Sequence, residues 1–334
     1  MPPSILALLT IVIGVSACIG YFYLSNLFLD KVLFPARGPN AGRNINRANM
    51  IRPWLFLFPA VFALSLYLVY PVIETLRLSL PQRVPGGYEW VGTKNYAQMF
   101  TEGKFWEALR NNMLWLIVVP AASTAFGLLA AQLTDRIRWG NVAKSLIFMP
   151  MAISFVGAAV IWKLVYDARP EGQEQIGLLN AIYLYLGGDS VQAWITLPFW
   201  NNFLLMVVLI WIQTGFAMVI LSAALRGIPE ETVEAAIIDG ANPLQIFFKI
   251  KVPQIRSSFV EVLSTSSITV LKVFDIVFAM TNGQWQTEVL ANYMYNKLFR
   301  ADDWGVGSAS AIIIMVLVMP ILGWNVRNAR REMS

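Results

Sequence analysis

The sequence predicts an all-α integral membrane protein with about seven transmembrane helices, and its composition and hydropathy are the observations behind this prediction. Of its 334 residues, 57% are hydrophobic and 13% are charged, with a mean hydropathy of +0.58. A soluble domain carries about twice that share of charged residues. A helix needs about 20 apolar residues to cross a bilayer. Segments of this kind lie at approximately 3–29, 54–76, 111–133, 144–167, 202–225, 258–281 and 306–326.

The residue inventory argues against catalysis and against nucleic-acid binding. The chain has no histidine, which removes the usual general base and the commonest metal ligand. Its only cysteine, Cys18, lies in an apolar segment, which excludes disulfides and cysteine metal sites within the chain. The net charge of +5 arises from basic residues that are spread over many short loops and not gathered on one face. We therefore expect no catalytic residue, no metal site and no nucleic-acid partner.

Lysine and arginine residues predict the orientation of the spans, because cytoplasmic loops carry an excess of these residues. Most of them fall in four segments, at 31–53, 136–144, 226–256 and 327–331. This distribution predicts a cytoplasmic C-terminus and an external N-terminus. The segment 36–49 is rich in glycine and asparagine, which is typical of a flexible linker. We divide the chain into an N-terminal helix with a basic cytoplasmic linker at 1–53 and a six-helix core at 54–334.

The long polar loop at 226–257 lies between two apolar segments and carries the signals of two short helices. Pro229 suits the first helical position, and Glu230 and Glu231 face the positive end of the helix dipole. Gly240 is placed to end this helix in the left-handed conformation. Asn242-Pro243 then caps a second short helix that runs to Pro253. The alternative is an ordinary interfacial loop that lies on lipid headgroups.

The same loop contains the pattern E-A-A-x3-G-x9-I-x-L-P, with Val252 in place of the leucine. This pattern resembles the loop of permease subunits of ATP-binding-cassette (ABC) importers, in which it contacts the ATPase. We call residues 226–257 the coupling loop. The resemblance assigns the ATPase contact to Glu234, Ala235, Ala236, Asp239, Gly240, Ile250 and Pro253.

The resemblance extends over about residues 54–328. Matching segments are Val91–Tyr96, Phe105–Leu109, Met149-Pro150, Gly177–Asn180, Gly215-Phe216, Phe274-Asp275 and Met280–Gly283. Many sugar-importer permeases have Gly-Gly-Pro after the threonine, where this chain has Asn282-Gly283-Gln284-Trp285. In that difference and in its additional N-terminal span, the chain most resembles the α-glucoside importer permeases. These are relatives of the larger permease subunit of the maltose importer.

The resemblance implies a type I importer core in the bacterial cytoplasmic (inner) membrane, together with several partners. These are a second homologous permease subunit, a dimeric ABC ATPase, an extracytoplasmic sugar-binding protein and membrane lipid. The chain has no Gly-x4-Gly-Lys-Ser/Thr motif, since Gly103-Lys104 is followed by Phe105. We therefore expect no cofactor in this chain, with ATP and Mg²⁺ bound by the partner ATPase.

Candidate residues of the sugar path lie within two predicted spans. Trp211, Gln213 and Thr214 stand in the middle of one span, and Trp162 lies in another. Sugars present hydroxyl groups and an apolar ring face, so aromatic rings and amides suit them. The alternative role for each polar residue is an interhelical hydrogen bond.

Lys272 and Asp275 suggest a second functional class. Their spacing of three residues places them on one face of a continuous helix, where they form an ion pair. An ion-coupled secondary carrier uses intramembrane charges of this kind. A structural ion pair is the simpler interpretation, because no second intramembrane acid completes a relay. A membrane enzyme is disfavoured by the absence of a nucleophile with a base.

Overall fold

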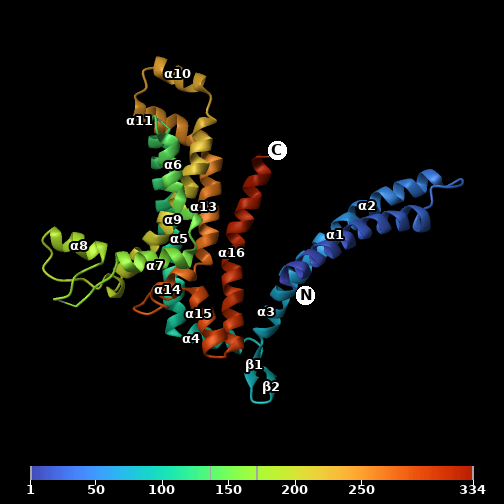
Figure 1. Cartoon of the computed structure of the whole chain (residues 1–334), viewed down its shortest axis with the longest axis horizontal. Coiled ribbons are helices and arrows are strands. Elements are labelled where there is room, and N and C mark those ends of the chain that lie inside the picture. Colours follow the sequence, from blue (N-terminus) through green and yellow to red (C-terminus); the bar gives the residue numbers. More distant parts are fainter. Residues whose placement is uncertain (1, 136, 171, 333–334) are drawn as a thin grey trace. The chain divides into compact units, whose positions relative to one another are not determined.

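The computed structural model describes residues 2–135, 137–170 and 172–332. Its internal contacts divide the chain into two compact units, residues 1–74 and residues 75–334 (Figure 1). The sequence predicted a boundary near residue 53, so the second predicted span belongs largely to the first unit. We describe each unit by itself.

The first unit is a pair of long helices. Helix α1 (Pro3–Phe28) continues as a π-helical turn (Leu29–Leu33), and α2 (Ala41–Leu64) continues through a second such turn (Ser65–Val69) into α3 (Tyr70–Leu78), which crosses the boundary between the units. The Tyr21 hydroxyl donates to the carbonyl of Leu55 at 2.9 Å, and the guanidinium of Arg52 pairs with the carboxylate of Asp30 at 2.7 Å. These contacts hold α2 against α1.

The prediction of a flexible linker at 36–49 is wrong for most of this segment, because α2 begins at Ala41. The Asn44 amide donates to the carbonyl of Pro35 at 2.9 Å, and Ala48 is buried. Tertiary contacts of this kind outweigh the weak helix propensity of glycine and asparagine. Residues Ala41–Leu78 span about 57 Å at 1.5 Å per residue, longer than the roughly 30 Å hydrocarbon core of a bilayer.

The second unit begins with a short antiparallel hairpin, β1 (Pro81–Val84) and β2 (Gly87–Trp90), in which Pro81 pairs with Trp90. The sequence did not predict strands. The helices that surround the bundle are α4 (Lys94–Thr101), α8 (Leu178–Tyr185), α14 (Asp275–Met280) and α15 (Leu290–Tyr295). The bundle itself contains the long helices α5 (Gly103–Thr134), α9 (Trp200–Arg226), α13 (Arg256–Leu271) and α16 (Trp304–Glu332), with the shorter α6 (Gly140–Phe148) and α7 (Phe155–Val165).

The described residues contain five helices that are long and apolar enough to cross a membrane. They are Ser4–Leu33, Ala41–Leu78, Gly103–Thr134, Trp200–Arg226 and Trp304–Asn328. A sixth span is present if the bent pair Gly140–Ala152 and Phe155–Val165 counts as one. The protein is therefore a helical membrane protein with five to six candidate spans, and two of the seven predicted spans differ from the prediction.

The predicted span 144–167 is bent by 104° between Ala152 and Phe155. Pro150 lies in the 3₁₀ turn Met149–Ala152, and its backbone nitrogen carries no hydrogen and so cannot donate a helical hydrogen bond. The Ser154 hydroxyl then caps a new helix by accepting from the Gly157 N–H at 3.1 Å. A proline and an N-cap four residues later explain the change of direction.

The predicted span 258–281 is divided into α13 and α14. Helix α13 has 16 residues, fewer than a bilayer crossing needs. The N–H groups of Lys272 and Val273 bond to the third residue before them, at 3.3 and 3.0 Å, which tightens and ends the helix. Phe274 leaves the helical conformation, with φ of −136° and ψ of −57°, and the next helix begins at Asp275.

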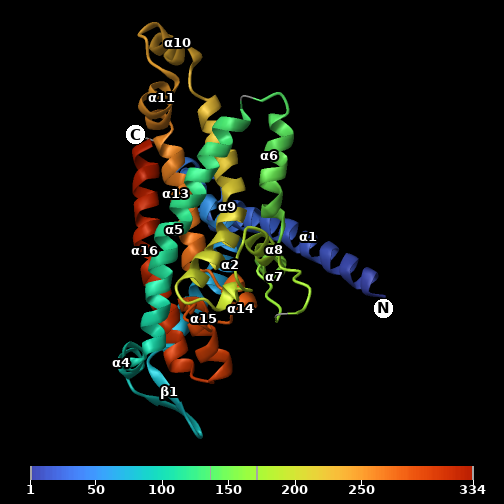
Figure 2. The same ribbon diagram turned by 90° about the vertical axis from the view of Figure 1, so that its left-hand side faces the viewer.

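Helix α9 lies at the centre of the second unit and packs closely on two neighbours. A Cβ atom at Gly127 of α5 would lie 2.4 Å from the Cβ of Ala217, and one at Gly215 would lie 2.7 Å from the carbonyl oxygen of Ile147 on α6. The backbones of α5, α6 and α9 therefore approach one another without intervening side chains at these points. Figure 2 shows the three helices running alongside one another.

Candidate functional site

The coupling loop leaves α9 and forms α10 (Glu230–Ile238), which lies with α11 beyond one end of the long helices (Figure 2). The helix begins one residue later than predicted, with Pro229 as its N-cap. Gly240 is left-handed, with φ of +79°. The N–H of Gly240 bonds to the carbonyl of Ile237, and that of Ala241 to the carbonyl of Ala236, both at 3.0 Å. The predicted glycine elbow is confirmed.

The second short helix of the loop also begins as predicted. The Gln245 N–H donates to the Asn242 side chain at 2.8 Å, and the Asn242 N–H donates to the Gln245 side chain at 2.9 Å. These reciprocal bonds form a capping box. The helix runs through α11 (Pro243–Gln245), a π-helical segment (Ile246–Lys251) and α12 (Val252–Gln254). Both turns of the loop are thus fixed by backbone geometry.

The two short helices expose four large apolar side chains, which together we call the docking patch. Its members are large side chains with exposed fractions of 59, 85, 70 and 62%: Ile237, Ile238, Leu244 and Phe248. Clusters of exposed apolar side chains mark interaction sites more often than isolated ones do. Ala235 and Asp239 are exposed beside it, whereas Ala236 is buried. Farther along the loop, Ile250 is half-buried and Pro253 is exposed.

Glu234 is exposed, and it makes no hydrogen bond or ion pair with another residue of the described chain. A local capping role for this carboxylate is therefore not seen. It borders a cavity of about 400 Å³ together with Arg226, Glu230 and Lys251. A second cavity, of about 320 Å³, lies between Gln132 of α5 and the loop residues Ile237 and Phe247.

The candidate path residues lie in the middle of the bundle but do not share one surface. The rings of Trp162 and Trp211 are 5.8 Å apart at an angle of 69°. The Thr214 hydroxyl donates to the carbonyl of Ile210 at 2.7 Å, so it bonds to its own helix. Gln213 is buried, and its amide bonds to none of the described residues. Two helical residues that are two positions apart point about 160° away from each other, so Trp211 and Gln213 line different sides of α9.

Lys272 and Asp275 do not form the predicted ion pair. The break between α13 and α14 separates them, Lys272 is exposed, and no ion pair joins them in the described chain. The prediction failed because it assumed one continuous helix.

At the opposite end of the second unit, the loop 281–289 is held in a strained conformation. Three residues other than glycine have positive φ: Asn282 at 52°, Trp285 at 53° and Gln286 at 63°. Four asparagines from α5 and α9 bond to the backbone of 285–290 at 2.7 to 3.0 Å, and these are Asn111, Asn112, Asn201 and Asn202. These four asparagines were not predicted as a group, although Asn201 and Asn202 lie in the first turn of α9 and Asn111 and Asn112 lie at the start of the predicted span 111–133.

Two carboxyl groups near this loop have shifted pKa values. Burial raises the pKa of Glu102, but hydrogen bonds from Lys297 and Tyr293 lower it by more, so the pKa lies below its ordinary value. Burial raises the pKa of Glu288 above its ordinary value, and the hydrogen bond from Asn292 opposes this only in part. These groups belong to the packing of α4, α5 and α15.

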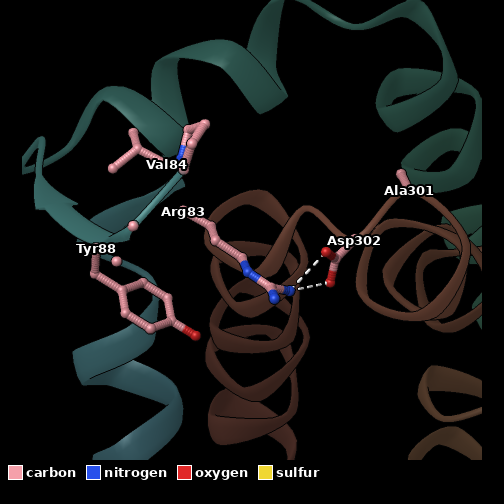
Figure 3. Close-up of a pocket in the computed structure, with 8 residues that line it drawn as sticks. Arg83, Val84, Tyr88, Ala301 and Asp302 are labelled. Carbon is pink, nitrogen blue, oxygen red and sulfur yellow. Dashed lines mark hydrogen bonds and ion pairs between the residues drawn. The ribbon is translucent and has the colours of Figure 1, made fainter.

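The hairpin contributes a further cavity, of about 550 Å³, which Figure 3 shows between the strands and the residues before α16. The guanidinium of Arg83 bonds to both carboxylate oxygens of Asp302, at 2.5 and 2.6 Å. Tyr88 and the tip glycines complete the lining. The ion pair is half exposed, so its contribution to stability is small.

Comparison with known proteins places this geometry in a family. Residues 123–332 match the family described as "Binding-protein-dependent transport system inner membrane component". The chain is 64% identical to the α-glucoside transport system permease protein AglF of Rhizobium meliloti, over 99% of each chain. It is 48% identical to the osmoprotective compounds uptake permease protein GgtC of Synechocystis, over 83% of this chain and 99% of the relative.

Solved structures share the fold. A bacterial ABC transporter that imports the acidic polysaccharide alginate has a chain that matches with a TM-score of 0.73 at 19% identity, covering 86% of this chain and 98% of that one. The match supports the helical arrangement. With the family match over most of the core, it follows that this protein belongs to the inner-membrane permease components of binding-protein-dependent ABC transporters.

Proposed function

We propose that this permease forms half of the translocation pathway for an α-glucoside or a related oligosaccharide. A second homologous permease forms the other half, and an extracytoplasmic binding protein delivers the sugar. The similarity to AglF over 99% of the chain supports the substrate class. The exposed docking patch supports the ATPase partner, because exposed apolar side chains at the tip of a rigid loop suit contact with another protein.

Coupling requires that the loop transmits motion without bending. Gly240 and the capping box of Asn242 fix the two turns of the loop, and Ala236 and Ile246 anchor it by burial. Closure of the ATPase dimer would then displace both ends of the loop, at α9 and α13, as one element. Glu234 and the docking patch are the contacts we assign to the ATPase, with Ala235, Ala236, Asp239, Gly240, Ile250 and Pro253 shaping the surface.

The sugar path is assigned to residues of α7 and α9. The Trp162–Trp211 pair provides aromatic surface for the apolar face of a sugar ring, and Thr214 lies on the same side of α9. Gln213 is 6% exposed, and its amide, which bonds to none of the described residues, gains a hydrogen bond from a sugar hydroxyl. Because Trp211 and Gln213 face different sides of α9, we assign them to successive contacts along the path.

Substitution of these residues tests the path. In proteoliposomes that hold both permeases and the ATPase, we expect Trp211→Ala and Gln213→Leu each to reduce uptake of a labelled α-glucoside about tenfold, the loss of roughly 1.4 kcal/mol. Trp211→Phe should retain most uptake, and Trp324→Ala, an exposed tryptophan near the end of α16, should retain all of it. Unchanged uptake kinetics in both Trp211→Ala and Gln213→Leu would move the path elsewhere. Uptake driven by a proton gradient without ATP would support the carrier alternative.

We propose a topology of seven crossings with the N-terminus outside, which requires that the divided segment 256–280 counts as one crossing. The excess of basic residues in the segment 31–53 supports this orientation. In a Cys18→Ser background, we expect Gly38→Cys to resist a membrane-impermeant maleimide in intact cells and to react after lysis. Glu89→Cys, on the exposed hairpin strand β2, serves as the external control and should react in intact cells. Labelling of Gly38→Cys in intact cells would contradict the topology.

A further inference from the structure

One carboxylate joins three helices at the end of the bundle from which the coupling loop departs. Asp135 follows α5 and forms an ion pair with Lys144 of α6. Its two carboxylate oxygens also accept from the hydroxyl of Ser222, on the last turns of α9, at 3.1 and 3.3 Å. Arg226, the last residue of α9, lies 3.7 Å from the same carboxylate. We call these four residues the Asp135 cluster.

Ser222 is the centre of the Asp135 cluster. Its hydroxyl is buried and accepts from the Lys144 ammonium at 2.7 Å and from the Arg226 guanidinium at 3.1 Å. The Lys144 and Asp135 side chains are 14 and 21% exposed, so solvent screens their interaction less than that of a surface pair. Two cations share one carboxylate. Loss of that charge leaves the Lys144 ammonium without its ion-pair partner beside a buried hydroxyl, whereas the Arg226 side chain, 62% exposed, stays in contact with water.

The Asp135 cluster lies at the start of the coupling loop. Arg226 is both the last residue of α9 and the first residue of the coupling loop, and it lines the cavity that Glu230 and Glu234 also border. Farther along α9, the backbone contacts at Gly127 and Gly215 leave no space between α9 and its neighbours α5 and α6. At the loop end of this three-helix packing, the backbone of α6 also approaches that of α5, between Gly140 and Thr134. The Asp135 cluster adds the side-chain contacts that join the end of α9 to both helices.

We propose that Asp135 is a positioning residue for coupling, which holds the loop end of α9 against α5 and α6 so that the three helices move as one body. The inference rests on the proposed docking of the ATPase on the coupling loop. Displacement of the loop then moves all three helices and reaches the sugar path on α9. Without the carboxylate, the end of α9 moves away from α5 and α6, and the displacement is lost before it reaches Trp211.

The test compares sugar transported with ATP hydrolysed in the reconstituted complex. Asp135→Asn keeps the shape of the side chain and removes its charge. We expect this variant to continue ATP hydrolysis but to transport about fivefold less sugar per ATP. A fivefold change is at the lower end of the effects that coupled sites usually have on each other. Lys144→Gln should shift the ratio in the same direction, and Asp135→Glu should restore part of it. Asp302→Asn, which breaks the exposed ion pair with Arg83 at the other end of the unit, should leave the ratio unchanged.

Two results would overturn the inference while leaving the proposed function intact. One is an unchanged ratio of sugar to ATP in Asp135→Asn and in Lys144→Gln. The other is a proportional loss of uptake and hydrolysis with a lower melting temperature, which would assign the Asp135 cluster to stability alone. Failure of the wild-type complex to link uptake to ATP hydrolysis would instead overturn the proposed function.

Discussion

Replacement of Gly240 by valine is expected to abolish sugar uptake while the chain still inserts into the membrane. Gly240 has a φ of +79°, in the left-handed region. Glycine adopts this conformation readily, whereas it costs a residue with a Cβ about 1–2 kcal/mol, and β-branched residues are rarely found there. Its surroundings are open, with no atom within 4 Å of the position that a Cβ would take, so the effect comes from backbone conformation and not from a clash. Valine would turn α11 away from α10 and divide the docking patch.

The variant is measured by uptake in cells and by the amount of ATPase that purifies with the permease. We expect uptake to fall more than tenfold, which corresponds to about 1.4 kcal/mol or more. Gly227→Ala is the matched control, because Gly227 lies in the same loop with an ordinary φ of −76°. Gly240→Asn should keep partial uptake, since asparagine tolerates the left-handed region. Wild-type uptake in Gly240→Val would show that the elbow has no role in coupling.

A change of charge in the same loop should act without altering the backbone. Glu234 is exposed and unpaired in the described chain, so Glu234→Lys is not expected to destabilise the permease itself. We expect this variant to lose ATPase contact for an electrostatic reason, with a loss of uptake as large as that of Gly240→Val. An equal loss of uptake in Gly240→Val, which changes the backbone, and in Glu234→Lys, which changes the charge, would show that the coupling loop contacts the ATPase.

Substitution of Gly127 by alanine should destabilise the permease, because it adds a methyl group where α5 and α9 are in close contact. The new Cβ would lie 2.4 Å from the Cβ of Ala217 and 2.9 Å from the backbone nitrogen of Met218, and neither atom can rotate away. Helices α5 and α9 must then separate along their closest contact. Overpacking of this kind costs about 1–3 kcal/mol.

The measurement is the temperature at which the detergent-solubilised permease loses its monodisperse profile in size-exclusion chromatography. We expect a clear decrease for Gly127→Ala. Gly323→Ala is the matched control, because Gly323 lies in α16 with open space around it. An unchanged melting temperature in Gly127→Ala would mean that α5 and α9 pack more loosely than described, and it would weaken the argument for a rigid three-helix unit.

The sequence predicted the coupling loop well because local signals determine its shape. Pro229, Gly240 and Asn242 each act on the backbone within a few residues, and each is found within one residue of its predicted position. The loop is also short enough that two turns define it. Helix ends of this kind can be derived without knowledge of the rest of the fold.

The bends within the spans could not be derived in the same way. Apolar residues stand on both sides of Lys272 at the end of α13, at Val270, Leu271 and Val273, so the average hydropathy of the segment does not reveal the break. Met149-Pro150 was noted for its family resemblance, but proline is common inside membrane helices, and here α5 contains Pro120 without a break.

Contacts between residues that are distant in the sequence could not be predicted, because they depend on how the helices pack together. Asn111 and Gln286 are 175 positions apart, and Arg83 and Asp302 are 219 positions apart.

Photo-crosslinking from Phe248 tests the central claim most directly. A photoreactive amino acid at this position, the exposed centre of the second short helix, is irradiated in membranes that contain the assembled complex. We predict a crosslinked product that contains the permease and the ATPase, and its loss in Gly240→Val. Labelling of lipid alone, with no ATPase crosslink in the wild-type background, would contradict the assignment of residues 226–257 as the coupling loop.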